Sequence, residues 1–217
     1  MKGFYNLPKF IQWLIAIILL VGGMTLFMPI ITMDYGLWLL PLIAPFLNFI
    51  TVPFFRLIGY FKYINPFVLS TVQSDKKYDL HNVFTFDYLV NFSWADRGER
   101  ARKIILGHYF KALLFIIERI ENNELSPEVK IVGNSYFFNE RTAEKLGFTV
   151  SKSSAFWVVN SAAQFIELSY LYSFSKSEWA LPEFWKVRKA EIIGSELVAK
   201  KEQLEKLVDK ILPEEYQ

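Results

Sequence analysis

The first quarter of the chain contains two long runs without charge. One extends from Phe10 to Thr32 and the other from Tyr35 to Phe55. About 20 apolar residues suffice to cross a hydrocarbon core of about 30 Å, so both runs are long enough. The loop around Asp34 leaves room only for a tight reversal. The pattern predicts an antiparallel hairpin of two transmembrane helices in residues 1–63.

The charges that flank the hairpin predict its orientation. Lys2 and Lys9 precede the first run. Arg56 and Lys62 follow the second run, and only Asp34 lies in the loop. Because Lys and Arg accumulate on the cytoplasmic side, we expect an integral, two-pass membrane protein with both termini in the cytoplasm. The length of the first run, and the lack of a small-x-small cleavage site after it, argue against a signal peptide.

The second run contains Pro41, Pro45 and Pro53, and Asn48 lies near its middle. Interior prolines kink a helix, and a polar amide within a span is suited to a hydrogen bond with another helix. We therefore expect a kinked helix that packs against a partner and crosses fully. The alternative is a re-entrant or shallow hairpin that never fully crosses.

Residues 64–81 are polar and mixed, and they read as a linker. In Val83–Trp94 large apolar side chains occupy every second position, which predicts a half-buried strand. Asp96 is a suitable N-cap for a helix that extends to about Asn122. Short apolar segments at Val129–Val132 and Phe148–Ser151 predict two further strands.

This order of elements predicts a cytoplasmic α/β domain over residues 82–181, with a mostly parallel or mixed sheet flanked by helices. A charged amphipathic helix is expected in residues 182–217. Its apolar positions follow a three-four spacing, which suits a helix that covers its own domain or, alternatively, a coiled coil or docking helix.

The composition of the chain excludes several classes of binding and catalysis. The net charge of +2 over 217 residues argues against bulk binding of nucleic acid. The chain has no cysteine, which excludes disulfides and thiolate chemistry. The two histidines, His81 and His108, have no carboxylate at a spacing typical of metal sites or triads, so we expect no metal site.

Basic residues gather in the first turns of the long predicted helix: Arg97, Arg100, Arg102 and Lys103. Cations oppose the helix dipole at this end, so they suggest a site for an anion such as phosphate or carboxylate. Anionic lipid headgroups are a second candidate. The third interpretation is a solvated helix face that Asp96 and Glu99 compensate.

Arg97-Gly98, followed by a helix, a strand and the segment Asn139–Phe148, resembles the second half of a GNAT-type N-acyltransferase. The likeness extends from Phe92 to Phe148 and keeps one of the two closely spaced glycines of the family's phosphate-binding turn. It implies a membrane-tethered acyltransferase that uses acyl-CoA. In that case Arg97, Gly98 and Arg102 form the phosphate turn, and Asn139 lies on the cofactor side.

A second polar feature is the turn that begins Gly133-Asn134-Ser135. It starts like a nucleophile elbow but lacks the closing glycine. At the carboxyl end of a strand, Asn134 and Ser135 are placed to line a polar ligand crevice.

Two classes of function remain. The first is a non-catalytic interaction or accessory protein at the inner face of the membrane. Besides the lipid bilayer, its partners are a membrane protein or a second copy, bound through the second transmembrane helix or the C-terminal helix. The second class is the acyltransferase-like enzyme, with acyl-CoA or another phosphate-bearing ligand. The sequence does not decide whether the domain is catalytic.

Overall fold

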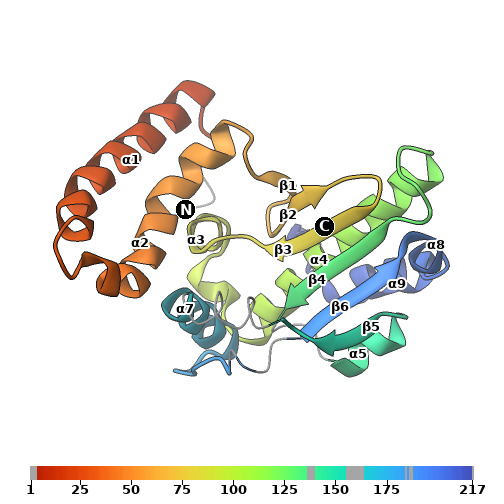
Figure 1. Ribbon diagram of the computed structural model, residues 1–217. Coiled ribbons are helices and arrows are strands. Elements are labelled where there is room, and N and C mark those ends of the chain that lie inside the picture. The colour runs from red at the N-terminus through yellow and green to blue at the C-terminus, as the bar shows by residue number, and fades with distance from the viewer. Residues whose placement is uncertain (1–3, 136–139, 155–163, 184, 186–187, 217) are drawn as a thin grey trace.

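The computed structural model of the chain describes residues 4–135, 140–154, 164–183, 185 and 188–216. Two helices form an apolar hairpin on one side of an α/β domain with a mixed sheet and flanking helices (Figure 1). The N-terminal apolar helix and the α/β domain are therefore confirmed.

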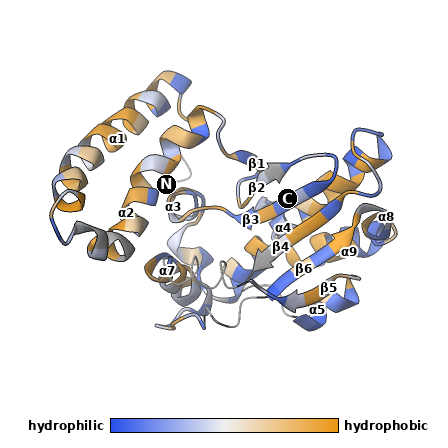
Figure 2. Cartoon of the chain, viewed as in Figure 1, coloured by the Kyte–Doolittle hydropathy of each residue, from blue (hydrophilic) through white to orange (hydrophobic). Residues whose placement is uncertain are grey.

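The hairpin consists of α1 (Lys9–Ile31) and α2 (Gly36–Leu57), which pack against each other. Figure 2 shows mainly apolar residues along both helices. Among the described residues, α1 is the one helix that is long and apolar enough to cross a membrane. In α2 the apolar stretch is shorter, Leu42–Leu57. The structure thus supports one candidate span where the sequence predicts two.

The six strands pair in the order β1-β2-β3-β4-β6-β5. Only β3 and β4 are parallel, whereas the other neighbours are antiparallel. The crossover between β3 and β4 contains the long helix α4. The strands are β1 (Lys62–Asn65), β2 (Val68–Gln73), β3 (Lys77–Asn82), β4 (Lys130–Ser135), β5 (Thr149–Lys152) and β6 (Arg188–Ile193).

Helix α4 forms the centre of the core. Phe110, Leu113, Ile116 and Ile117 in this helix are fully buried and pack with the apolar side chains of the sheet. The helix α9 lies along α4, so the apolar seam of the C-terminal segment is buried within its own domain. The helices are α3 (Thr85–Asn91), α4 (Glu99–Glu121), α5 (Glu140–Lys145), α7 (Phe165–Lys176), α8 (Gly194–Val198) and α9 (Lys201–Ile211), with short 3-10 helices η1 (Trp94–Asp96) and η3 (Glu214–Tyr216).

The strand predicted at Val83–Trp94 is wrong, because α3 and η1 occupy this segment. In a helix with about 100° per residue, Phe86 and Val90 share one face, and Tyr88 and Phe92 share nearly the opposite face. The first pair packs against the hairpin and the second against the domain. Burial on two opposite faces of a short helix therefore produces the alternation of a strand.

The sheet also includes segments that the sequence assigns elsewhere. Strand β2 and all of β3 but its last residue lie in the predicted linker 64–81, and β6 lies within the predicted helix 182–217. In β6, Ile192 belongs to the core and Ala190 packs against it, whereas Lys189 and Glu191 form an ion pair with each other. Lys189 and Glu191 therefore lie between the core-facing positions of this strand.

Candidate functional site

The junction between the hairpin and the domain is built around a buried carboxylate, Asp87 of α3. Arg56, in the last turn of α2, forms an ion pair with Asp87 at 2.9 Å. The hydroxyl of Tyr63 in β1 donates to Asp87 Oδ2 at 2.7 Å, and the hydroxyl of Tyr5 donates to Oδ1. We call these four residues the Asp87 cluster.

The charges in the Asp87 cluster are well satisfied. The Asp87 side chain is fully buried, and burial raises its pKa, a shift that the hydroxyls of Tyr5 and Tyr63 and the guanidinium of Arg56 oppose. The Arg56 guanidinium lies between two rings, with Cζ 3.5 Å from the centroid of Tyr5 and 3.8 Å from that of Tyr63. Such cation–π contacts favour a fixed guanidinium position. Residues before α1, at the end of α2 and in the domain thus meet at one carboxylate.

A second buried carboxylate joins α7 to the same junction. Glu167 Oε1 accepts hydrogen bonds from the backbone N–H of Thr85 at 2.6 Å and from its hydroxyl at 2.7 Å. The amide of Asn48, in α2, donates to Glu167 Oε2 at 3.4 Å. Thr85 is the first residue of α3, so this carboxylate satisfies a helix N-terminus. The interhelical bond predicted for Asn48 is therefore made to the domain rather than to another membrane helix.

Beside this junction, α7 borders an open groove of about 550 Å³, which we call the α7 groove. Its walls are mostly aromatic and aliphatic, with serines along α7. Trp94 and Trp179 are 74% and 82% exposed at its rim. The groove is lined by Trp94, Arg97, Phe165, Ile166, Ser169, Tyr170, Ser173, Phe174, Ser177, Glu178, Trp179 and Leu181.

Of the predicted anion-binding residues, Arg97 and Gly98 lie at the α7 groove. Arg97 lines it and stacks on Trp94, with Cζ 4.3 Å from the ring centroid. Gly98 is the N-cap of α4 with φ +71°, and its N–H donates to the carbonyl of Phe174 at 2.9 Å. A Cβ on Gly98 would approach Ser177 Oγ to 2.6 Å, so both conformation and space require glycine here.

Arg100 and Arg102 are directed elsewhere. Arg100 donates to Asp96 at 2.9 Å and forms an ion pair with Glu215. Asp96 is buried, and although burial raises its pKa, hydrogen bonds from Ser93, from Tyr216 and from Arg100 lower it to about 2. The chain's own carboxylate therefore occupies the position near the start of α4 that the sequence suggests for an anion. Arg102 is exposed on α4.

Asn134 and Ser135 are not among the residues that line this groove. Asn134 and Ser135 end β4, where their backbones pair with Lys189 and Arg188 of β6, and Asn139 lies outside the described residues. In the segment after it, Ala143 and Phe148 are core residues, and Gly147 has φ +86°. The end of α5 thus has the geometry of a helix whose apolar seam is followed by a C-cap glycine.

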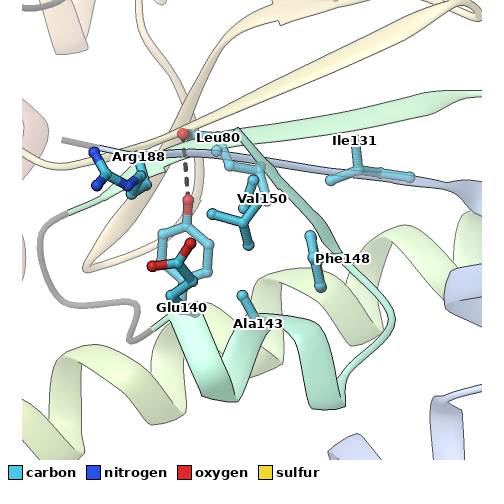
Figure 3. A pocket seen from close by; sticks show the side chains of 10 residues that line it. Leu80, Ile131, Glu140, Ala143, Phe148, Val150 and Arg188 are labelled. Atoms are coloured by element: carbon cyan, nitrogen blue, oxygen red, sulfur yellow. Dashed lines mark hydrogen bonds between the residues drawn. The ribbon is translucent and has the colours of Figure 1, made fainter. Parts of the chain in front are cut away.

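Under α5 the structure has a small cavity (Figure 3). Ala143, Phe148 and Val150 line its apolar part, while Glu140 and Arg188 lie toward one end of it. Its volume of about 20 Å³ is enough for one water molecule. We therefore do not place a ligand there.

Two polar features on the sheet and α4 were not predicted from the sequence. In β3, His81 Nε2 lies 3.3 Å from Asp79 Oδ1, and burial lowers the pKa of His81, which the Asp79 carboxylate partly offsets. In α4, His108 is buried against Phe67, with ring centroids 4.6 Å apart. Neither ring nitrogen of His108 has a hydrogen-bond partner within the described residues.

The sequence contained only a partial signal for the Asp87 cluster. Asp87 is a carboxylate within the apolar segment 83–92, which marks it as a candidate for burial with a partner. Arg56 is 31 positions away and Tyr5 is 82 positions away. Pairing over such separations cannot be inferred from local patterns. No group of three His, Asp or Glu residues that could hold a metal ion is found within the described ranges.

Fold and site together define a class: an α/β domain with a mixed sheet, joined through buried ion pairs and hydrogen bonds to an apolar N-terminal hairpin. Comparisons of the chain with models of protein families, with curated proteins and with solved structures give no match.

Proposed function

We propose that the protein is a membrane-anchored accessory protein whose domain lies at the cytoplasmic face of the membrane and binds an anionic amphiphile in the α7 groove. The observation that carries the proposal is the position of this groove, because α7 both lines it and contacts the hairpin through Glu167. A ligand in the groove would lie close to the membrane anchor. The orientation follows from Lys9, Arg56 and Lys62 at the base of the hairpin.

The chemistry of the lining supports this class of ligand. Pockets of about 300–1,000 Å³ with apolar walls and few polar groups are typical of small-molecule sites. Here exposed aromatic rings offer the apolar walls, and Arg97 offers a cation held over Trp94. A ligand with a hydrocarbon body and a phosphate or carboxylate end matches both features.

The predicted partner surfaces are less suited to this role. The apolar seam of α9 packs on α4, and the second half of α2 packs on the domain. Both contacts lie within one chain, which leaves the α7 groove and the outer surface of the hairpin for partners.

The test is quenching of tryptophan fluorescence in the detergent-solubilised full chain. A dibrominated fatty acid quenches Trp94 and Trp179 when bound, and its uncharged methyl ester is the reference probe. We expect Arg97→Gln to weaken binding of the acid about tenfold, the effect of about 1.4 kcal/mol, and to leave the ester unchanged. Arg102→Gln is the matched control. Equal affinity of Arg97→Gln and the parent chain for the acid would contradict the proposal.

A second candidate is the acyltransferase-like enzyme. The parallel pair β3–β4, joined through α4 with a left-handed glycine at its N-cap, favours it, and the Asp79–His81 pair on β3 offers a group for proton transfer. In the structure, however, α3 separates the strand from the turn, whereas the resemblance implies a direct connection. Calorimetry of CoA and acyl-CoA with the full chain distinguishes the candidates, because the accessory role requires no affinity for CoA itself.

A further inference from the structure

The exposed apolar surface of the hairpin is unequally distributed along its length. In α2 the strongly exposed large side chains are Trp38, Leu39, Leu42 and Phe46, all in its first half. From Leu47 to Leu57 every residue is buried or half-buried. The boundary falls where the domain begins to cover α2, at Asn48 and Phe49, which contact Glu167 and Phe86.

This boundary limits how far the hairpin extends beyond the domain. Ten helical steps separate Gly36 from Phe46, which at 1.5 Å per residue is about 15 Å. Within α1, Gly23 lies against Ile50, and beyond it most residues up to Ile31 are exposed. A hydrocarbon core is about 30 Å thick, so the free end of the hairpin is about half as long as a crossing requires.

A complete crossing would also bring charged and polar groups of the domain into hydrocarbon. Asn48 would lie well inside the core, and with it Glu167 and the start of α7. Lys176, the last residue of α7, and Glu178, which follows this helix, are both exposed. Charged side chains in the hydrocarbon are costly, which disfavours this arrangement.

The outer face of α1 gives the alternative. Phe10, Leu14, Ile18, Val21 and Met28 are exposed and recur at helical spacing along the whole helix. The helix is uncharged between Lys9 at its start and Asp34 in the loop beyond its end. When α1 lies nearly parallel to the membrane plane, this face is buried in hydrocarbon and Lys9 and Asp34 both reach the same headgroup layer. The exposed Trp94 and Trp179 on the adjacent α7 groove are residue types that favour that layer.

We propose that the hairpin is monotopic: it inserts into the leaflet on the domain's side of the bilayer and does not reach the opposite face. The inference rests on the membrane attachment in the proposed function, and it replaces a transmembrane crossing with an anchor in one leaflet. Lipids of the bilayer cover the exposed apolar side chains of the hairpin. A second copy of the chain is the competing occupant.

Site-specific labelling of introduced cysteines tests this proposal, because the chain has no cysteine of its own that would react with the label. Asp34→Cys places a thiol at the tip of the hairpin, and Arg102→Cys places one on the exposed face of α4. Each variant is reconstituted into vesicles of phosphatidylcholine and phosphatidylglycerol. A membrane-impermeant maleimide is then supplied either outside the vesicles or trapped in their lumen.

We expect the thiols of Asp34→Cys and Arg102→Cys to react with maleimide that is supplied on the same side of the vesicle membrane. Protection of the Asp34→Cys thiol from both sides until detergent is added would contradict the placement of Asp34 in the headgroup layer on the domain's side. Reaction of the two thiols from opposite sides would overturn the proposal and leave the membrane-anchored function intact. Failure of the chain to float with the vesicles would contradict both the monotopic insertion and the membrane-anchored function. Sedimentation would then test whether a dimer buries the hairpin.

Discussion

Arg56 and Asp87 form the buried ion pair that joins the hairpin to the domain, with Nη1 and Oδ1 2.9 Å apart. Asp87 is fully buried, and Arg56 is sandwiched between Tyr5 and Tyr63. The pair lies between the end of α2 and α3. The packing of the hairpin against the domain therefore depends on buried contacts of the folded core rather than on a flexible linker.

Removal of the cation should therefore destabilise the protein strongly. Arg56→Ala leaves Asp87 buried with hydroxyl donors only, and breaking a buried pair in this way costs about 3–5 kcal/mol. Arg102→Ala, at an exposed arginine on α4, is expected to change the free energy of unfolding by less than about 0.5 kcal/mol. Denaturant unfolding of both variants in detergent measures the difference. Equal midpoints for the two variants would show that the pair does not stabilise the junction.

Glu167 is expected to contribute through the N-terminus of α3. Glu167→Gln retains the shape but removes the charge that accepts two hydrogen bonds from Thr85, and we expect a loss of about 1–3 kcal/mol. Glu121→Gln is the control, because its ion pair with Lys201 is exposed and worth about 1 kcal/mol or less. The same unfolding measurement compares them. A larger loss in the control would refute the role of Glu167.

Close packing within the hairpin depends on one of two adjacent glycines. A Cβ at Gly23 would approach Ile50 Cδ1 to 2.0 Å, whereas Gly22 has no atom within 4 Å of the same position. Gly23→Leu should separate α1 from α2 and lower the free energy of unfolding by about 1–3 kcal/mol. Gly22→Leu should be tolerated. Thermal unfolding with near-ultraviolet circular dichroism checks both, and indistinguishable variants would mean that α1 does not pack on α2 as described.

His108 should make stability depend on pH. Burial, with a smaller effect from Lys111, lowers its pKa from 6.5 to about 4. Between these values the unfolded chain binds more protons than the folded chain, so stability falls as pH falls from about 7 to about 4 and this contribution then levels off. His108→Phe, which keeps the contact with Phe67, should flatten this part of the profile. An unchanged slope in the variant would assign the dependence to other groups.

Sequence patterns predict the N-terminal apolar helix, the α4 core helix and the α/β class well, because these depend on local periodicity and length. The end of α5 follows the same logic, since Gly147 adopts the positive φ expected of a glycine that ends a helix. Hydrophobic periodicity predicts the wrong element where a short helix is buried on two opposite faces. Phe86 and Tyr88 alternate like strand residues because α3 is buried on both sides.

The candidate site is less predictable than the fold. The sequence predicts Arg97 and Gly98 as residues of an anion or cofactor site, but the groove beside them is formed with Ser177 and Trp179 from beyond α7. The pairing of Arg100 with Glu215, near the end of the chain, likewise requires the tertiary structure. Contacts over such sequence separations leave no local pattern.

The contacts of Arg56 with Asp87 and of Asn48 with Glu167 should hold the hairpin and the domain as one rigid unit in a lipid bilayer. The most direct measurement is the distance between spin labels at Thr25→Cys on α1 and Arg102→Cys on α4, both exposed positions, by electron–electron double resonance in lipid nanodiscs. We expect a single narrow distance distribution, which Arg56→Ala broadens. A broad distribution in the chain with Arg56 intact would contradict it.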